Sequence, residues 1–150
     1  MTATDANEIA IRGLIDTFVD GWNAADGEKL AAAFTEDANF TAITGLHARG
    51  RTLIARGHNE ILSTVYRGTR NSGSIQSIHY LRPDVAVVDA RFTLRHPDGA
   101  LVFGIPFSSA GIIATNDDGV WRIAVFRNMV PFARQEPGPL EQQLTAASRA

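Results

Sequence analysis

The residue in this sequence best suited to acid–base chemistry is His58, which falls in the segment 51–67. That segment is predicted to be a helix because its apolar residues recur at intervals of three and four. His58 follows Ile54 by four positions and precedes Ile61 by three, so it shares their apolar face and should point toward the interior or a cavity. There it would bind a ligand or act as a general base near neutral pH. The structural alternative is a buried histidine that bonds a backbone carbonyl or the first helix.

Asn128 is a second candidate, near the end of a predicted strand at 120–130. Strict alternation places it on one face with Phe126 and Ala124, and assigns Trp121, Ile123, Val125 and Arg127 to the other. If the Phe126 face lines a cavity, the amide would orient a polar group of the ligand. The alternative is a strand-end side chain that caps a turn or bonds the backbone.

Aromatic residues would form the apolar walls of such a cavity. Phe18 and Trp22 lie on the apolar face of a predicted first helix, Phe40 lies on a short strand, and Phe103 lies on a predicted strand at 101–115. We expect these four to contact the ligand, although aromatic residues at helical spacing more often belong to a packed core.

Several kinds of chemistry receive no support. The chain has no cysteine, which excludes disulfides, thiolate zinc sites and a cysteine nucleophile. The histidines at 47, 58, 79 and 96 lack the spacing of metal ligands, and no glycine-rich dinucleotide loop is present, so no metal and no cofactor are expected. A net charge of −2 with a single lysine argues against nucleic-acid binding. No apolar run is long enough for a membrane span and no signal segment is evident, so we expect a cytoplasmic protein without membrane contact.

The 150 residues suit one domain, with a core at about 7–131 and a tail at 132–150. Asp5 or Asn7 should cap a first helix that runs to about Asn23, and Asp26 should cap a short second helix. Residues 96–99 and 116–119 have the composition of hairpin turns. Helices are expected at 28–34 and 51–67, with a short one in the tail at 140–147, and strands at 39–43, 74–82, 85–95, 101–115 and 120–130. This order predicts an α+β fold, a cone in which three N-terminal helices pack on a curved antiparallel sheet.

Four motifs in order, the first of them made of two segments, resemble a known superfamily. Residues 22–26 (WNAAD) and 32–40 (AAFTEDANF) resemble the opening of the SnoaL-like, nuclear-transport-factor-2-like proteins, which have a cystatin-like cone. The segments 45–58, 81–88 (LRPDVAVV) and 121–128 (WRIAVFRN) resemble the SgcJ/EcaC-type branch, whose members often lie in natural-product gene clusters, including those for enediynes. The resemblance covers about 9–130. It implies a small-molecule-binding accessory protein or enzyme that acts on an apolar, polyketide-type ligand.

The resemblance also limits the chemistry. Steroid-isomerase-type members use a tyrosine and two acids, and the matching positions here are Phe18, Ala42 and Gly111, none of which transfers a proton. A cofactor-independent isomerase, cyclase or dehydratase with His58 as base therefore stands beside two alternatives, a non-catalytic shielding protein and a structural dimerisation domain. In this superfamily the outer sheet face commonly pairs two subunits. The charged, alternating Asp89, Arg91, Thr93 and Arg95 predict such a homodimer interface, or a solvated face.

Overall fold

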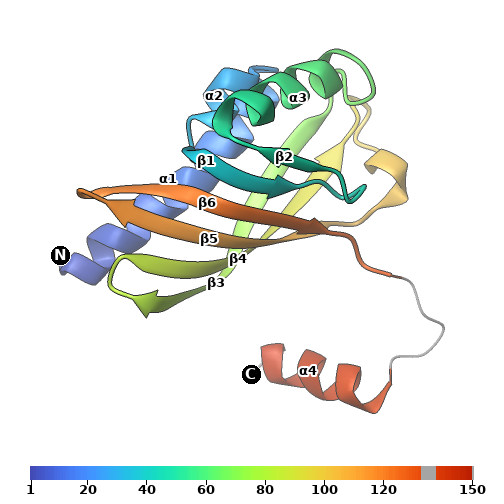
Figure 1. Cartoon of the computed structure of the whole chain (residues 1–150). Helices are drawn as coiled ribbons and strands as arrows, with labels where there is room; N and C mark the ends of the chain where they lie inside the picture. Colours follow the sequence, from blue (N-terminus) through green and yellow to red (C-terminus); the bar gives the residue numbers. More distant parts are fainter. Residues whose placement is uncertain (133–137, 150) are drawn as a thin grey trace.

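The computed structural model describes residues 1–132 and 138–149 and has the predicted α+β architecture. Three helices cover one face of a six-stranded sheet, and a further helix follows the last strand (Figure 1). The helices are α1 (Ala3–Asn23), α2 (Gly27–Ala31), α3 (Arg51–Ser63) and α4 (Pro139–Arg149), with a 3₁₀ turn, η1, at Val102–Gly104. The strands are β1 (Phe34–Thr41), β2 (His47–Arg49), β3 (Arg70–Arg82), β4 (Val85–Arg95), β5 (Ser108–Asp117) and β6 (Val120–Met129).

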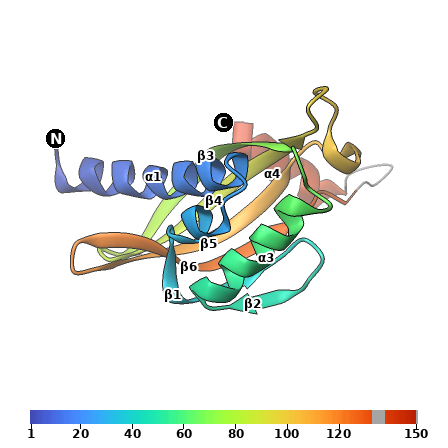
Figure 2. The same ribbon diagram turned by 90° about the horizontal axis from the view of Figure 1, so that it is seen from above.

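The sheet has the strand order β2-β1-β6-β5-β4-β3. All neighbouring pairs are antiparallel except β1 and β6, which run parallel, so the sheet is mixed. This parallel pair joins the first strand of the chain to the last, after α3 and the long meander have been completed between them. The sheet curves around α1 and α3, and Figure 2 shows α1 lying along it with α3 over β1 and β2. A cone with one wide end results.

The start of α1 differs from the sequence-based one, whereas its end at Asn23 is as predicted. Thr2, and not Asp5 or Asn7, caps the helix, because the Thr2 hydroxyl accepts from the Asp5 amide while the Asp5 carboxylate accepts from the Thr2 amide. Asp26 caps α2 as predicted. Helix α2 ends at Ala31 because the chain extends from Phe34 as β1, whose predicted start at Asn39 was too late.

The predicted strand at 101–115 is wrong in its first half. Residues Val102–Gly104 form η1, where Phe103 has a φ of 53° and Gly104 a φ of 67°. Pro106 follows after Ile105 and has no amide hydrogen to offer a neighbouring strand. Strand β5 therefore begins only at Ser108, and the segment before it forms an irregular loop at the wide end of the cone.

A β-bulge in β6 changes which of its residues face inward. The pairing of β5 with β6 shifts between Ile113 and Ala114, so that Ile113 opposes Val125 while Ala114 opposes Ile123. Trp121 and Ile123 are consequently buried on the same side of the sheet as Phe126. Strict alternation predicted the opposite face for Trp121 and Ile123, and this prediction was wrong because a bulge adds one residue to the count.

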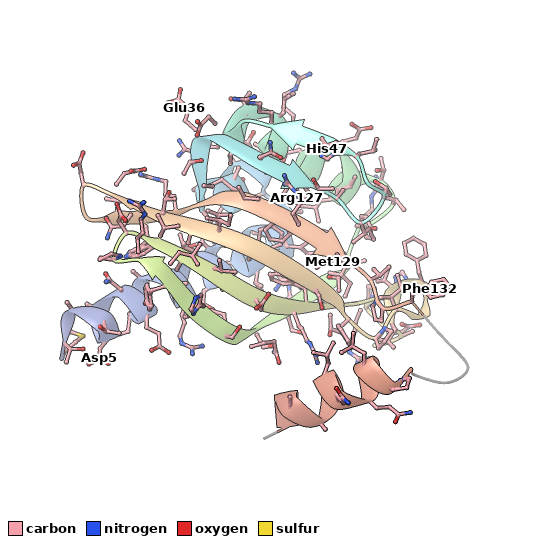
Figure 3. The ribbon with its side chains drawn as sticks, turned by 60° about the horizontal axis from the view of Figure 1, so that its bottom comes forward. Asp5, Glu36, His47, Arg127, Met129 and Phe132 are labelled. Atoms are coloured by element: carbon pink, nitrogen blue, oxygen red, sulfur yellow. The ribbon has the colours of Figure 1, made fainter. Side chains whose placement is uncertain are left out.

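The two faces of β4 follow the predicted pattern. Ala86, Val88, Ala90 and Phe92 are buried beneath the helices, while Asp89 and Arg91 are exposed. Figure 3 views this outer face, with Arg127 and Met129 on the outer side of β6 and Phe132 beyond its end. Helix α4 stands apart from the cone in Figure 1. Within the described residues, no helix is both long and apolar enough to cross a bilayer.

Candidate functional site

A cavity of about 610 Å³ opens at the wide end of the cone, between α1, α3 and the inner face of the sheet. This volume lies within the usual range for small-molecule sites. Its lining is largely apolar and draws on segments far apart in the sequence. Among the lining residues are Phe18, Trp22, Phe40, Ile54, His58, Tyr66, Asn71, Phe92, Phe126 and Asn128.

His58 projects from α3 into this cavity and is 5% exposed. Its Nδ1 lies 2.7 Å from the carbonyl oxygen of Ile54, one turn earlier on the same helix. Because a carbonyl can only accept, Nδ1 carries the proton and donates it, which leaves Nε2 of the neutral ring as an acceptor. In the described part of the chain Nε2 has no hydrogen-bond partner, and it is not among the fully enclosed unpaired atoms. The cavity is the remaining place where Nε2 can find one.

Three aromatic rings hold the imidazole in this orientation. The ring centroids of Phe40, Phe18 and Trp22 lie 5.2, 5.9 and 6.0 Å from that of His58, each approaching edge-on. The indole of Trp22 is itself fixed, because its Nε1 donates to the Thr69 hydroxyl at 3.0 Å. These contacts leave His58 in a dry, preorganised environment on the side away from the cavity.

Burial lowers the pKa of His58 from its ordinary value of 6.5, because the surrounding apolar side chains penalise the charged form. The hydrogen bond to the Ile54 carbonyl acts in the opposite direction and is the smaller effect. The imidazole is therefore neutral at pH 7. A neutral imidazole with a free Nε2 is a base in its working form.

This lowered pKa predicts an acid-sensitive stability. Above pH 6.5 the ring is neutral in both states; below it the unfolded chain takes up a proton that the folded protein binds less readily. Stability therefore falls as the pH drops from 6.5 through the folded-state pKa. Thermal unfolding between pH 7.5 and 5 should show a larger fall in Tm for the wild type than for His58→Gln. Equal falls would contradict the buried neutral imidazole.

Asn71 is a cavity residue that the sequence did not identify. It is 7% exposed, lies near the start of β3, and has a side-chain oxygen that is fully buried without a partner among the described residues. The strand had been predicted to begin only at Ser74, so nothing indicated the direction of this side chain. Asn128, predicted as a site residue, has the same unpaired buried oxygen and lines the same cavity.

The predicted aromatic residues divide into two groups. Phe18, Trp22 and Phe40 are buried, with exposures of 4%, 7% and 7%, and form the inner wall beside His58. Phe103 does not belong to that wall, because it sits on η1 at the cavity mouth, is 66% exposed, and meets Tyr66 edge-on at 6.1 Å. Its predicted placement on a strand was wrong because the extended backbone is interrupted by η1 and Pro106, and β5 begins only at Ser108.

The positions matched to a steroid-isomerase triad carry no titratable group. Phe18 and Ala42 line the cavity, as that match required. Gly111 lies on the outer face of β5, because its neighbours Ala110 and Ile112 are the buried residues. The alignment had matched Gly111 to an inward-facing acid, so it was wrong by one residue at this strand. Neither inward neighbour can donate or accept a proton. A triad of that type cannot form at these positions.

Few charged side chains line the cavity. Among the described residues that line it, Glu60 is the single carboxylate, and there is no lysine or arginine. In the same described part of the chain, no three histidine or acidic side chains gather as they would around a metal ion. His58 and Asn71 are the buried polar side chains of this lining, and Asn128 is half-buried beside them. The lining also includes the side chains of His47, Tyr66 and Ser108, which are more exposed.

These features define a class by structure: a cystatin-like α+β cone with a ligand-sized cavity, the fold of nuclear-transport-factor-2-like proteins. A domain of unknown function with a cystatin-like fold from Nostoc punctiforme matches with a TM-score of 0.81 at 25% identity, over 96% of this chain and 95% of its own. A protein assigned provisionally as a scytalone dehydratase, from Novosphingobium aromaticivorans, gives 0.70 at 19% identity over 91% of each chain.

A hexachlorocyclohexane dehydrochlorinase from Novosphingobium barchaimii matches with a TM-score of 0.74 at 16% identity, over 91% of this chain and 98% of its own. No family model matches the chain. No curated protein matches it either. The superfamily predicted from the motifs is thus supported at the level of fold.

Proposed function

We propose that this protein binds a largely apolar small molecule in the cone and that His58 acts on it as a general base, without a cofactor. One observation carries the proposal: a neutral imidazole, buried in an aromatic wall, has Nδ1 committed to the Ile54 carbonyl and Nε2 left for the cavity. The bond to the Ile54 carbonyl is also the bond expected of a structural histidine, so the proposal depends on the other nitrogen, Nε2. Here the ring is held by three edge-on aromatic contacts and retains one accepting atom.

The proposed reaction class is proton abstraction that leads to isomerisation, cyclisation or elimination of water. Two solved structures with the same fold have names that denote eliminations, a provisionally assigned dehydratase and a dehydrochlorinase, and these names support elimination as the reaction class proposed here. The motif resemblance to the SgcJ/EcaC-type branch supports a polyketide-type intermediate of natural-product biosynthesis as the substrate. The mostly hydrocarbon lining suits such a molecule.

The second candidate is a non-catalytic protein that shields a reactive apolar metabolite. It is favoured by the shortage of proton-transfer groups, because His58 has no carboxylate partner in the described residues and Glu60 is the one acid in the lining. A base without a second acid must return the proton itself or pass it to water. Binding without turnover needs none of this.

Exchange of the α-protons of β-tetralone in D₂O, followed by NMR, separates the two candidates. β-Tetralone is a neutral, apolar ketone whose enolisation requires only a positioned base. The wild type should accelerate exchange, and His58→Gln should reduce the accelerated rate by about 100-fold, the scale of general-base catalysis, with little change in affinity. His79→Gln, on the exposed part of β3, is the matched control.

Binding of β-tetralone without acceleration by the wild type would support the shielding protein instead. A rate that His58→Gln leaves unchanged would remove His58 from the role of base. Failure of both proteins to bind the ketone would contradict the cavity as the site.

We also propose that two copies of the chain pair through the outer sheet face. Val87, Ile113 and Val125 stand directly opposite one another on β4, β5 and β6 and form an apolar row across the partly exposed outer face. Asp89, expected at the interface, already accepts from the Ser77 hydroxyl at 2.9 Å within its own chain. Sedimentation should find a dimer that Ile113→Glu converts to a monomer and that Val120→Glu, at the exposed start of β6, leaves intact. A monomeric wild type would end this proposal.

A further inference from the structure

The two amides of the cavity lack partners in a way that points to the chemistry of the ligand. The side-chain oxygens of Asn71 and Asn128 are enclosed by protein, yet neither has a hydrogen-bond partner in the part of the chain described. The backbone of Asn71 is satisfied separately, since its amide donates to the Asn23 side chain at 2.7 Å and its carbonyl accepts from that side chain at 3.0 Å. Its side chain is therefore free of any role in holding β3 to α1.

An enclosed amide without partners is costly, because its hydration is lost and nothing replaces it. Neither amide nitrogen has a partner among the described residues, and neither nitrogen is among the fully enclosed atoms. Both side chains line the cavity, and rotation about χ2 brings either end of an amide to its surface. A bound molecule is thus the partner that each amide lacks.

The positions of the two amides set the shape of that molecule. Asn71 on β3 opposes Leu94 on β4, whereas Asn128 on β6 opposes Ala110 on β5. Strands β4 and β5 therefore lie between the strands of the two amides. Three interstrand spacings separate the two backbones, about 14 Å measured along the sheet. A single small polar group cannot meet both amides. The apolar lining between them, including Phe92 and Phe126, fits hydrocarbon.

The charge of the lining sets the chemistry of the polar groups. Without a lysine or arginine among the described lining residues, a carboxylate or phosphate would be desolvated with no counter-charge. A hydroxyl is neutral, and it both donates and accepts, so it complements an amide presented by either its oxygen or its nitrogen. A carbonyl would complement the nitrogen alone.

We propose that the ligand is an uncharged, elongated, mostly hydrocarbon molecule that carries hydroxyl groups at two separated positions, one bound by Asn71 and the other by Asn128. This inference rests on the proposed function, because it assumes that the cavity is a ligand site. It assigns to Asn71 and Asn128 the recognition of the two ends of the molecule, in the same cavity that His58 of α3 lines.

Calorimetric binding of a biphenyl series tests the proposal. The series comprises biphenyl, its para-monohydroxy and para,para′-dihydroxy derivatives, and the para,para′-dicarboxylate. We expect the dihydroxy compound to bind most tightly and the dicarboxylate to bind weakest. Asn71→Leu and Asn128→Leu should each weaken the dihydroxy compound about tenfold and leave biphenyl unchanged or tighter. Asn39→Leu, the same exchange on the outer side of β1, should change nothing.

Thermal unfolding of the unliganded variants provides a second measurement. Loss of an unpaired enclosed amide should leave the Tm of Asn71→Leu and Asn128→Leu unchanged or raised, whereas a clear fall in Tm would show that the amides serve the fold. Equal affinity for biphenyl and the dihydroxy compound, unaffected by either variant, would overturn this inference but leave the cavity intact. If no member of the series binds, including biphenyl, the proposed ligand site fails and this inference with it.

Discussion

Replacing Gly21 with alanine should lower the free energy of unfolding by about 3 kcal/mol, because the added methyl group has no space. A Cβ at this position would lie 2.5 Å from the Cα of Leu30 and 2.6 Å from its Cβ. Carbon atoms in contact are normally separated by about 3.5–4.0 Å. Helices α1 and α2 would have to move apart. Since α1 carries Phe18 and Trp22, the change should also reduce binding in the cavity.

Gly13 on the same helix provides the matched control. A Cβ there would have no atom within 4 Å, so Gly13→Ala adds helix propensity without a clash and should raise stability by about 0.5–1 kcal/mol. Urea unfolding monitored by circular dichroism measures both variants. A loss of similar size in the two would show that the close approach of α1 to α2 does not determine the result.

Replacing Phe126 with alanine should cost about 3–5 kcal/mol, the range for removing a large buried aromatic residue. The side chain is 1% exposed and stacks against Phe40 and Phe18, with ring centroids 4.8 and 5.2 Å apart. Its removal leaves a void that opens into the ligand cavity. Phe18 and Phe40, two of the three rings that contact His58, would lose their support, so ligand affinity should fall together with stability.

Phe132→Ala is the comparison for that experiment, because this phenylalanine is 87% exposed beyond the end of β6 (Figure 3). Its loss should change the free energy of unfolding by less than about 0.5 kcal/mol. Chemical denaturation yields both values with a common m-value, provided that the compactness of the unfolded state is unchanged. A Phe126→Ala variant as stable as Phe132→Ala would mean that the aromatic cluster contributes little to the core.

Local spacing was enough to predict much of the molecule. The recurrence of apolar residues at three and four positions placed Phe18 and Trp22 on the buried side of α1, and His58 on the buried side of α3. Turn residues at 96–99 and 116–119 marked two of the reversals of the meander. Alternation gave the two faces of β4 correctly. These features depend on periodicity, which is a property of neighbouring residues along the chain.

The remaining features depend on partners far away in the sequence. The face of Trp121 and Ile123 follows from a bulge in the pairing of β5 with β6, and the exposure of Phe103 follows from the way η1 leaves the sheet. The parallel pairing of β1 with β6 joins segments that no local pattern relates. The role suggested for Asn71 emerges only when folding buries its side-chain oxygen beside the cavity.

The sequence alone thus determined that the imidazole of His58 would point inward from one helix of an α+β cone. Helical periodicity assigns a residue to a face without reference to the rest of the molecule. The tertiary structure decided which of the two imidazole nitrogens stays available and which polar groups share its cavity. Packing between distant segments sets those outcomes. The rings of Phe18 and Phe40 fix the His58 imidazole so that Nδ1 meets the Ile54 carbonyl of its own helix, and two amide oxygens are buried without partners among the described residues.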